Sequence, residues 1–403
     1  MTKRRQVLGY LGGTFLSLLF DQPLVRAASL ATKADNNNNP WDNRGFALGT
    51  GAREKRLHPD TPCPVIGSPG HVIAGNFSGT SFKTIPTQFL PHQIIQNSKN
   101  PDQLFAVHKW GESSVEISLT SEKTRSLPLP ANHYFYGHGV MSPNNEHVLI
   151  GAMDYKANVG VLLIYNTKTL KLDDLRPTYG VLPHDMQLSA DQKHLFIMHS
   201  GLKPDFRKPM KAAGATQDLS SNLARIDFAT GKLIDQINLE HGDKGYGHFV
   251  ITGEQKFLCF GVTSDPDRAH LPTAIASITD KTVTDLTLDP ILTNVHGEAL
   301  SARKTLDGKK VIVTIPSNSA IVILDAEKLK PMKVISNIEI PSALVYSPDP
   351  SLMIVSRAQE PMVAYSIPQE RFSSLDKIAK INGSLRTKWI GTGSHGTEIV
   401  WPS

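Results

Sequence analysis

The sequence predicts an all-β protein folded as a seven-bladed β-propeller, and three observations lead to this fold class. Short apolar segments rich in Val, Ile and Leu, such as "VGVLLIYN", "NLARIDF" and "AIVILDA", are separated by Gly, Asn, Asp and Pro. A segment that opens with histidine recurs along the chain. The intervals between these segments have room for four strands each, which is the content of one propeller blade.

Seven segments open in the same way, with an apolar stretch, a polar turn and a second, more apolar stretch. Their first residues are His92, His138, His184, His248, His296, Ser342 and His395. Successive starts lie 46, 46, 64, 48, 46 and 53 residues apart, and third and fourth strands such as "LLIYNTKTLKLDDL" fill the intervals. Seven starts therefore predict seven blades.

The last copy ends at Ser403 after a single strand, so its blade needs strands from elsewhere. Residues 71–90 precede the first complete copy and can supply them, which would close the ring by pairing N- and C-terminal strands. Closure of this kind removes open sheet edges. The polar, Asn-rich stretch before it predicts a poorly ordered lead-in over residues 29–63, followed by the propeller over residues 64–403.

The N-terminal residues 1–28 read as an export signal. Arg4 and Arg5 precede the apolar run Val7–Phe20, and "LVRAASLA" offers small residues for cleavage after Ala27 or Ala28. The arginine pair is similar to a twin-arginine signal. The run holds 14 residues and three glycines, fewer than the ~20 apolar residues that a membrane-spanning helix needs. We therefore expect a periplasmic or otherwise exported protein with no transmembrane anchor once the signal is removed.

Composition argues against a nucleic-acid partner. The formal net charge of +5 includes four basic groups and one acidic group in residues 1–28, and without them 38 Lys and Arg face 36 Asp and Glu. The remaining +2 gives no basic surface of the size that nucleic acid or an anionic membrane requires. Cys63 and Cys259 could pair in an oxidising compartment, but "KFLCFGV" favours a buried thiol at Cys259.

The combination of "PH", a following "S-x-D" turn, "LF" and "IDFATGKL" resembles the YVTN-type propellers of the quinoprotein amine dehydrogenase-like superfamily. Together with the N-terminal signal, the "GHG" and "PHD" openings also resemble an uncharacterised family of exported bacterial propellers of unknown function. The resemblance covers residues 64–403. It implies the fold and export, and it implies no catalytic residue, because these propellers serve as enzymes, cofactor binders and scaffolds.

The position of the histidines follows from propeller topology. The first strand of every blade lines the central channel, and its start lies at one rim. We therefore expect the histidines that open blades to meet around one mouth: His92, His138, His184, His248, His296 and His395. The second strands return to the same rim and bring further candidates from near their ends: His108, Asp154, His199, Asp265 and Arg357. Glu298 is two residues past His296 and should lie on the same side of its strand.

The leading hypothesis is a metal site at this mouth, for metal handling or redox chemistry. Imidazole suits Fe, Cu or Zn, and a nearby carboxylate can bind a metal or orient the second ring nitrogen. Three or four of the six opening histidines would be direct ligands. The residues from the second strands would orient those ligands or contact a substrate, and Arg357 would contact an anion.

Other interpretations stay open, and the sequence does not decide whether the protein is an enzyme. In WD-repeat propellers a Gly-His histidine forms hydrogen bonds within its own blade, although the WD ending is missing from this sequence. The protein could also be a metal-free scaffold that docks another periplasmic protein. A third alternative is a lactonase-like, metal-dependent hydrolase, although such sites use more carboxylates.

A basic loop and several missing motifs complete the expectations. The insertion "SGLKPDFRKPMKAAGATQDLSSN" should overhang the same mouth, as a lid over a small anionic ligand or as a solvated surface loop. Its basic residues are Lys203, Arg207, Lys208 and Lys211. The sequence has no CxxCH for covalent haem, no nucleotide-binding glycine loop and no nucleophile elbow. It also lacks the repeated Trp motif that accompanies pyrroloquinoline quinone, which argues against that cofactor.

Overall fold

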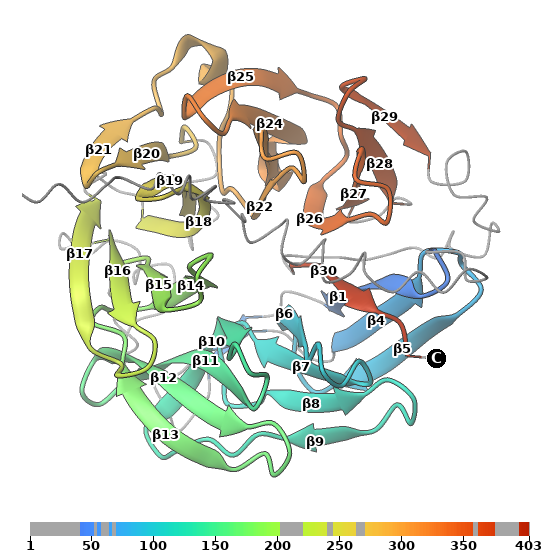
Figure 1. Cartoon of the computed structure of the whole chain (residues 1–403), viewed down its shortest axis with the longest axis vertical. Helices are drawn as coiled ribbons and strands as arrows, with labels where there is room; N and C mark the ends of the chain where they lie inside the picture. The colour runs from blue at the N-terminus through green and yellow to red at the C-terminus, as the bar shows by residue number, and fades with distance from the viewer. Residues whose placement is uncertain are drawn as a thin grey trace, which may run out of the picture.

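The described part of the chain is a seven-bladed β-propeller, as the sequence predicted. The computed structural model describes residues 41–51, 55–57, 64–66, 70–201, 221–239, 245–262, 271–357, 362–374 and 395–402. These residues form seven four-stranded antiparallel sheets, arranged around a central axis (Figure 1). Helical structure within them is limited to the short turns η2 (Pro290–Leu292) and η3 (Pro316–Asn318), and none of it could cross a membrane.

Six blades are each built from four consecutive strands, ordered from the axis outward. The first three are β6 (Pro91–Gln96), β7 (Gln103–His108), β8 (Val115–Ser118), β9 (Thr124–Ser126); β10 (His133–Met141), β11 (His147–Asp154), β12 (Val159–Asn166), β13 (Leu172–Pro177); and β14 (Pro183–Leu188), β15 (His194–His199), β16 (Ser221–Asp227), β17 (Leu233–Leu239). The next three are β18 (Gly245–Gly253), β19 (Lys256–Val262), β20 (Ile275–Thr279), β21 (Thr282–Asp285); β22 (Ser301–Lys304), β23 (Lys310–Ile315), β24 (Ala320–Asp325), β25 (Lys330–Ile335); and β26 (Pro341–Tyr346), β27 (Leu352–Arg357), β28 (Val363–Ser366), β29 (Arg371–Ser374).

The seventh blade joins the two ends of the chain. Its innermost strand is β30 (Thr397–Val400), followed outward by β1 (Arg44–Gly51), β4 (Gly70–Asn76) and β5 (Phe82–Thr87). The closure by N- and C-terminal strands is as predicted. The start of the propeller is not, because β1 lies within the expected lead-in of residues 29–63.

A short hairpin of β2 (Lys55–Leu57) and β3 (Pro64–Ile66) separates β1 from β4. The composition of residues 29–63 concealed β1, since polar and Asn-rich neighbours precede an eight-residue strand whose partners are β4 and, at the far end of the chain, β30.

Burial decreases from the axis outward and explains the strand sequences. Every residue of β7 is buried, whereas every residue of β9 is exposed. The inner strands have neighbouring blades against both faces, so they are continuous apolar runs rather than alternating ones. Burial of each Val, Ile or Leu side chain contributes about 1.5–3 kcal/mol.

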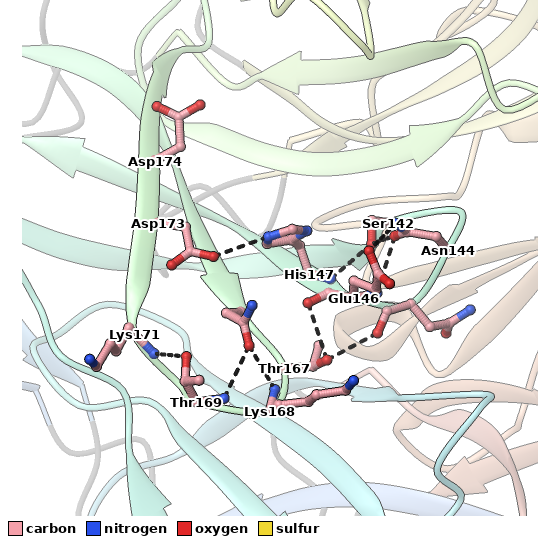
Figure 2. Close-up of polar contacts among 12 residues, drawn as sticks. Ser142, Asn144, Glu146, His147, Thr167, Lys168, Thr169, Lys171, Asp173 and Asp174 are labelled. Carbon is pink, nitrogen blue, oxygen red and sulfur yellow. Dashed lines mark hydrogen bonds and ion pairs between the residues drawn. The ribbon is translucent and has the colours of Figure 1, made fainter.

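Short polar side chains fix the hairpin turn between the first two strands of a blade. In the blade of β10, Ser142 Oγ accepts the backbone N–H of His147 at 2.9 Å and donates to Asn144 at 2.7 Å (Figure 2). The His147 ring lies 3.2 Å from the Asp173 carboxylate, at the periphery of the blade (Figure 2). The same turn recurs at Ser189 and at Thr305, so equivalent positions in different blades can be counted from it.

Candidate functional site

Five of the predicted histidines meet on the propeller axis. Four of them lie on the innermost strands of their blades and the fifth lies two residues before such a strand. We call them the histidine cluster: His92, His138, His184, His248 and His395. Their ring centres lie 4.6 to 5.9 Å apart in the closest pairs. Residues from both ends of the propeller sequence therefore share one site.

The cluster is buried rather than open at a channel mouth, since its side chains are between 1% and 8% exposed. Both ring nitrogens of His138 and of His184, and Nε2 of His248, have no hydrogen-bond partner among the described residues. A buried polar atom without a partner costs about 1–3 kcal/mol. Five such nitrogens in one place therefore mark a site built for something other than stability.

Bulges in the innermost strands turn the histidines toward the axis. The pairing of β6 with β7 leaves His92 as an extra residue, and the pairing of β14 with β15 does the same for His184. A bulge of this kind redirects the extra side chain. A glycine is required at Gly137, next to the His92 ring. The φ angle of Gly137 is +90°, and a Cβ atom there would lie 2.6 Å from Cδ2 of His92.

The imidazoles are neutral at neutral pH. Burial is the largest cause that lowers the pKa of all five below the usual 6.5, and the charge of Lys109 lowers each of them further. The pKa of His248 falls to about 3. Neutral imidazole is the form that binds metal ions, so the cluster needs no prior deprotonation to act as a ligand set.

The carboxylate of Asp185 lies beside two rings of the cluster. Its Oδ1 is 3.8 Å from Nδ1 of His138, and its Oδ2 is 3.9 Å from Nδ1 of His248. The same oxygens accept the backbone N–H groups of Met186 at 2.8 Å and of Phe249 at 3.3 Å. Burial nevertheless raises the pKa of Asp185 to about 6. A carboxylate in this place can orient imidazole rings or bind an ion.

The residue after a site histidine also fastens one blade to the next. Asp185 accepts from Phe249, which follows His248 in the next blade. Gln93, the residue after His92, makes the corresponding contact between the blade of β6 and the blade of β10. Its Oε1 accepts the backbone N–H of Gly139 at 2.7 Å. These hydrogen bonds fix the backbone next to the cluster histidines without involving the imidazole rings.

The nitrogens fall into two overlapping groups that could hold a metal ion. Within each group the ligand nitrogens lie within 4.8 Å of one another. The first trio is His92, His138 and His395, and the second trio is His138, His184 and His248. The donor set is therefore made of neutral, buried imidazoles.

Comparison with known proteins gives the family. Residues 86–379 match the family described as "Protein of unknown function (DUF1513)". The chain belongs to this family. Curated protein sequences yield no match to the DUF1513 chain.

Solved propellers share the fold of the DUF1513 protein. Hydrazine synthase from Kuenenia stuttgartiensis superposes with a TM-score of 0.56 at 12% identity, over 80% of this chain and 95% of that one. The β-propeller domain of Swd1 from Myceliophteria thermophila superposes with a TM-score of 0.51 at 11% identity, over 76% and 94%. At these identities the likeness establishes the fold alone.

One predicted histidine of the DUF1513 protein lies outside the cluster. The backbone of His296 forms a bridge with Pro272, and its carbonyl oxygen accepts the Ser317 hydroxyl at 3.1 Å. The prediction that six histidines share the site is therefore wrong for His296.

The turn between the first two strands explains the error. Ser189 and Thr305 occupy the same place in their turns, since the backbone N–H of each bonds to the first residue of the next strand. Five residues before Ser189 is His184, whereas five residues before Thr305 is Leu300. His296 therefore lies four residues before the position that corresponds to His184.

His108 and His199 end their second strands as predicted, but they belong to neither trio. The His108 ring stacks on Phe89 with 4.8 Å between ring centres. Nδ1 of His199 lies 2.9 Å from Oδ1 of Asn222, and a side chain at Gly180 would overlap its ring. Burial lowers the pKa of His199 to about 4. Both are packed parts of the blades.

The remaining candidates of the DUF1513 protein belong to neither trio or lie outside the described residues. Asp154 Oδ1 accepts the backbone N–H groups two and three residues later, at 2.9 Å each, and so caps a hairpin turn. Arg357 ends β27, opposite Pro341. Burial raises the pKa of Tyr136, and Glu298 lies near enough for its charge to add to this effect. Outside the described residues lie Cys63, Lys203, Arg207, Lys208, Lys211 and Asp265. Cys259 is a buried free thiol.

Sequence reasoning missed four residues around the cluster. The charge of Lys109 adds to the burial that lowers the pKa of every cluster histidine, and the charge of Arg303 partly offsets the burial that raises the pKa of Asp185. The Tyr136 ring lies 5.6 Å from a ring of the cluster and stacks on Trp110 at 5.5 Å. The only local signal was that Lys109 and Trp110 directly follow a predicted residue, His108.

Proposed function

We propose that the protein binds a transition metal ion at the histidine cluster, in a metal-handling or redox role. The observation that carries this proposal is the burial of five neutral imidazoles with at least five ring nitrogens that lack hydrogen-bond partners among the described residues. A bound ion would satisfy those nitrogens and offset the cost of burying them.

The donor chemistry selects the class of metal. Imidazole suits Fe, Cu and Zn, whereas Ca²⁺ and Mg²⁺ require oxygen ligands. The two trios consist of nitrogen donors alone. We therefore expect one of the three transition metals and no tight binding of Ca²⁺ or Mg²⁺.

A purely structural role for the histidines fits the contacts less well. In that case each ring should form a hydrogen bond within its own blade, as Nδ1 of His199 does by donating to Oδ1 of Asn222. His138 and His184 instead contact the rings of other blades and make no ring hydrogen bond within the described residues. The scaffold alternative makes no use of this arrangement, and a lactonase-like site would use more carboxylates.

We further propose export to the periplasm, on the strength of the N-terminal charge and apolar pattern. A partner would then be another periplasmic protein or a small anionic ligand. Cell fractionation of the full-length chain tests this, beside an Arg4→Lys, Arg5→Lys variant. Retention of the native chain in the cytoplasm would overturn it.

Elemental analysis tests the metal proposal. The native protein, purified after expression with its own signal, is compared with a His138→Ala, His184→Ala double variant. The matched control is His147→Ala, which removes a histidine at the edge of a blade, paired with Asp173. We expect Fe, Cu or Zn near one equivalent or more in the native and control proteins and less than a tenth of that in the double variant.

Circular dichroism and thermal unfolding establish that the variant is folded. A native protein without metal that takes up none on incubation with Fe²⁺, Cu²⁺ or Zn²⁺ would contradict the proposal and favour the scaffold. Equal metal in the native protein and in a folded double variant would place the ion elsewhere.

A further inference from the structure

We propose that the histidine cluster is a two-ion centre in which His138 is shared between two metal positions. This inference rests on the proposed function and adds to it the number of ions and their different surroundings. The first position is formed by His92, His138 and His395, and the second by His138, His184 and His248.

Ring spacing fits one ion in each trio. Two imidazoles bound to one ion through bonds of about 2 Å have ring centres on the order of 5 Å apart. In the first trio the centres lie 4.6, 4.7 and 4.8 Å apart, and in the second 4.7, 5.1 and 5.4 Å. Ring centres alone do not separate the trios, since His248 and His395 are also 4.7 Å apart. The ligand nitrogens do separate them.

The two nitrogens of His138 face different positions. Asp185 follows His184 in the chain and lies 3.9 Å from Nδ1 of His248, so its carboxylate marks the side of the second trio. Nδ1 of His138 lies 3.8 Å from the same carboxylate. Nε2 is separated from Nδ1 by Cε1, and the in-plane directions of the two nitrogens diverge widely, so we assign Nε2 to the first trio. Both nitrogens are buried and have no hydrogen-bond partner among the described residues.

The two positions are chemically different. The first offers imidazoles only, which suits copper. The second has the Asp185 carboxylate beside its imidazoles and suits zinc or iron. When both nitrogens of His138 coordinate, the ring loses its N–H proton to solvent, and the resulting negative charge is shared by the two ions.

Copper titration of metal-free protein tests the inference. Cu²⁺ is added in steps to the full-length mature protein, and bound copper and the electron paramagnetic resonance signal are measured. We expect two equivalents to bind. The signal should rise with the first equivalent and fall to less than half of the expected two-spin intensity with the second, because an imidazole bridge couples the two spins.

Variants assign the ions to the trios. His395→Ala should lose the first position and His184→Ala the second, so each should bind one equivalent with an uncoupled signal. His138→Ala should lose the coupling entirely. The control His147→Ala should behave as the native protein.

The outcomes separate this inference from the proposed function. Two coupled equivalents that become one in His395→Ala and His184→Ala support it. Saturation at one equivalent in the native protein overturns the two-ion centre and leaves the metal site intact. Two equivalents with unchanged coupling in His138→Ala would overturn the sharing of His138. No bound copper, zinc or iron would overturn both proposals.

Because a variant can bind less metal by misfolding, each titration is paired with thermal unfolding of the metal-free protein. A second substitution, His138→Gln, keeps the approximate size of the side chain and replaces both donor nitrogens with an amide that cannot bridge two ions. It should retain at most one equivalent.

Discussion

The backbone N–H of His395 donates to the carbonyl oxygen of His92 at 2.6 Å, and His395 is also bridged to Gln93 in parallel. His92 lies on the first strand of the first complete blade, and His395 lies two residues before β30. The contact that closes the ring therefore also brings two predicted ligands together. The same hydrogen bond therefore contributes to ring closure and to assembly of the site.

We expect bound metal to stabilise the closure of the ring. An ion held by His92 and His395 ties β30 to the first blade, and a ligand at 100 times its Kd stabilises the folded state by about 2.7 kcal/mol. Amide hydrogen exchange of Thr397–Val400 should slow by at least tenfold in metal-loaded protein. Exchange in β24, whose blade contributes no cluster histidine, should change less. Equal changes in both strands would mean that the ion does not act at the closure.

The second prediction is that His184→Leu does not destabilise the metal-free protein. Its two ring nitrogens have no hydrogen-bond partner among the described residues, and removing such groups relieves a cost of about 1–3 kcal/mol. The unfolding temperature without metal should stay the same or rise, and the increase on adding metal should be lost.

His199→Leu is the matched contrast for that measurement. It is equally buried but its Nδ1 is paired with Asn222, so its loss should destabilise the protein by about 1–3 kcal/mol. If His184→Leu destabilised the metal-free protein as much as His199→Leu, His184 would have a structural role.

The third prediction concerns acid. Burial holds the pKa of the cluster histidines below the 6.5 of the unfolded chain, and those of His248 and His199 near 3 and 4. Below pH 6.5 the unfolded chain binds more protons than the native state, so the free energy of unfolding falls as pH falls. Each such histidine contributes a slope of about 1.4 kcal/mol per pH unit within its window.

Denaturant unfolding of metal-free protein at pH 7.5, 6 and 5 measures this slope, and His184→Leu should reduce it. Asp185 acts in the opposite direction, because its folded pKa near 6 lies above the usual 3.8 and the native state holds the extra proton between these values. Asp185→Asn should therefore steepen the acid dependence below pH 6. A flat profile in the native protein would contradict the burial of neutral imidazoles.

The sequence carried enough information to predict the blades and most of the cluster. Repeat spacing fixed the number of blades, and propeller topology then brings residues such as His92 and His248 to one axis without any local motif. The prediction was wrong for His296 because this residue fits the spacing of the repeat but lies too far from the turn at Thr305. Counting residues back from the turn, rather than from one histidine to the next, would have revealed this difference.

Contacts between blades could not be predicted in the same way. Asp185 bonds to Phe249, 64 residues later, and no local pattern marks such a pair. β1 was missed for the same reason, since its partner β30 lies at the opposite end of the chain. The packing of the Tyr136 ring against the cluster and against Trp110 likewise depends on contacts between blades.

The last prediction is that Gly137→Ala weakens metal binding without touching a ligand. The new Cβ would lie 2.6 Å from Cδ2 of His92, so the ring must move, and the φ of +90° adds strain of about 1–2 kcal/mol. Displacement of a ligand by its support costs about 10–100-fold in metal affinity, which competition with a chelator of known affinity measures. Gly79→Ala, in the β4–β5 turn at a φ of +72°, is the control that carries backbone strain away from the site. The Gly79→Ala variant should lose stability and keep its metal affinity. Equal metal affinity in the Gly79→Ala and Gly137→Ala variants would mean that the position of His92 does not matter for binding.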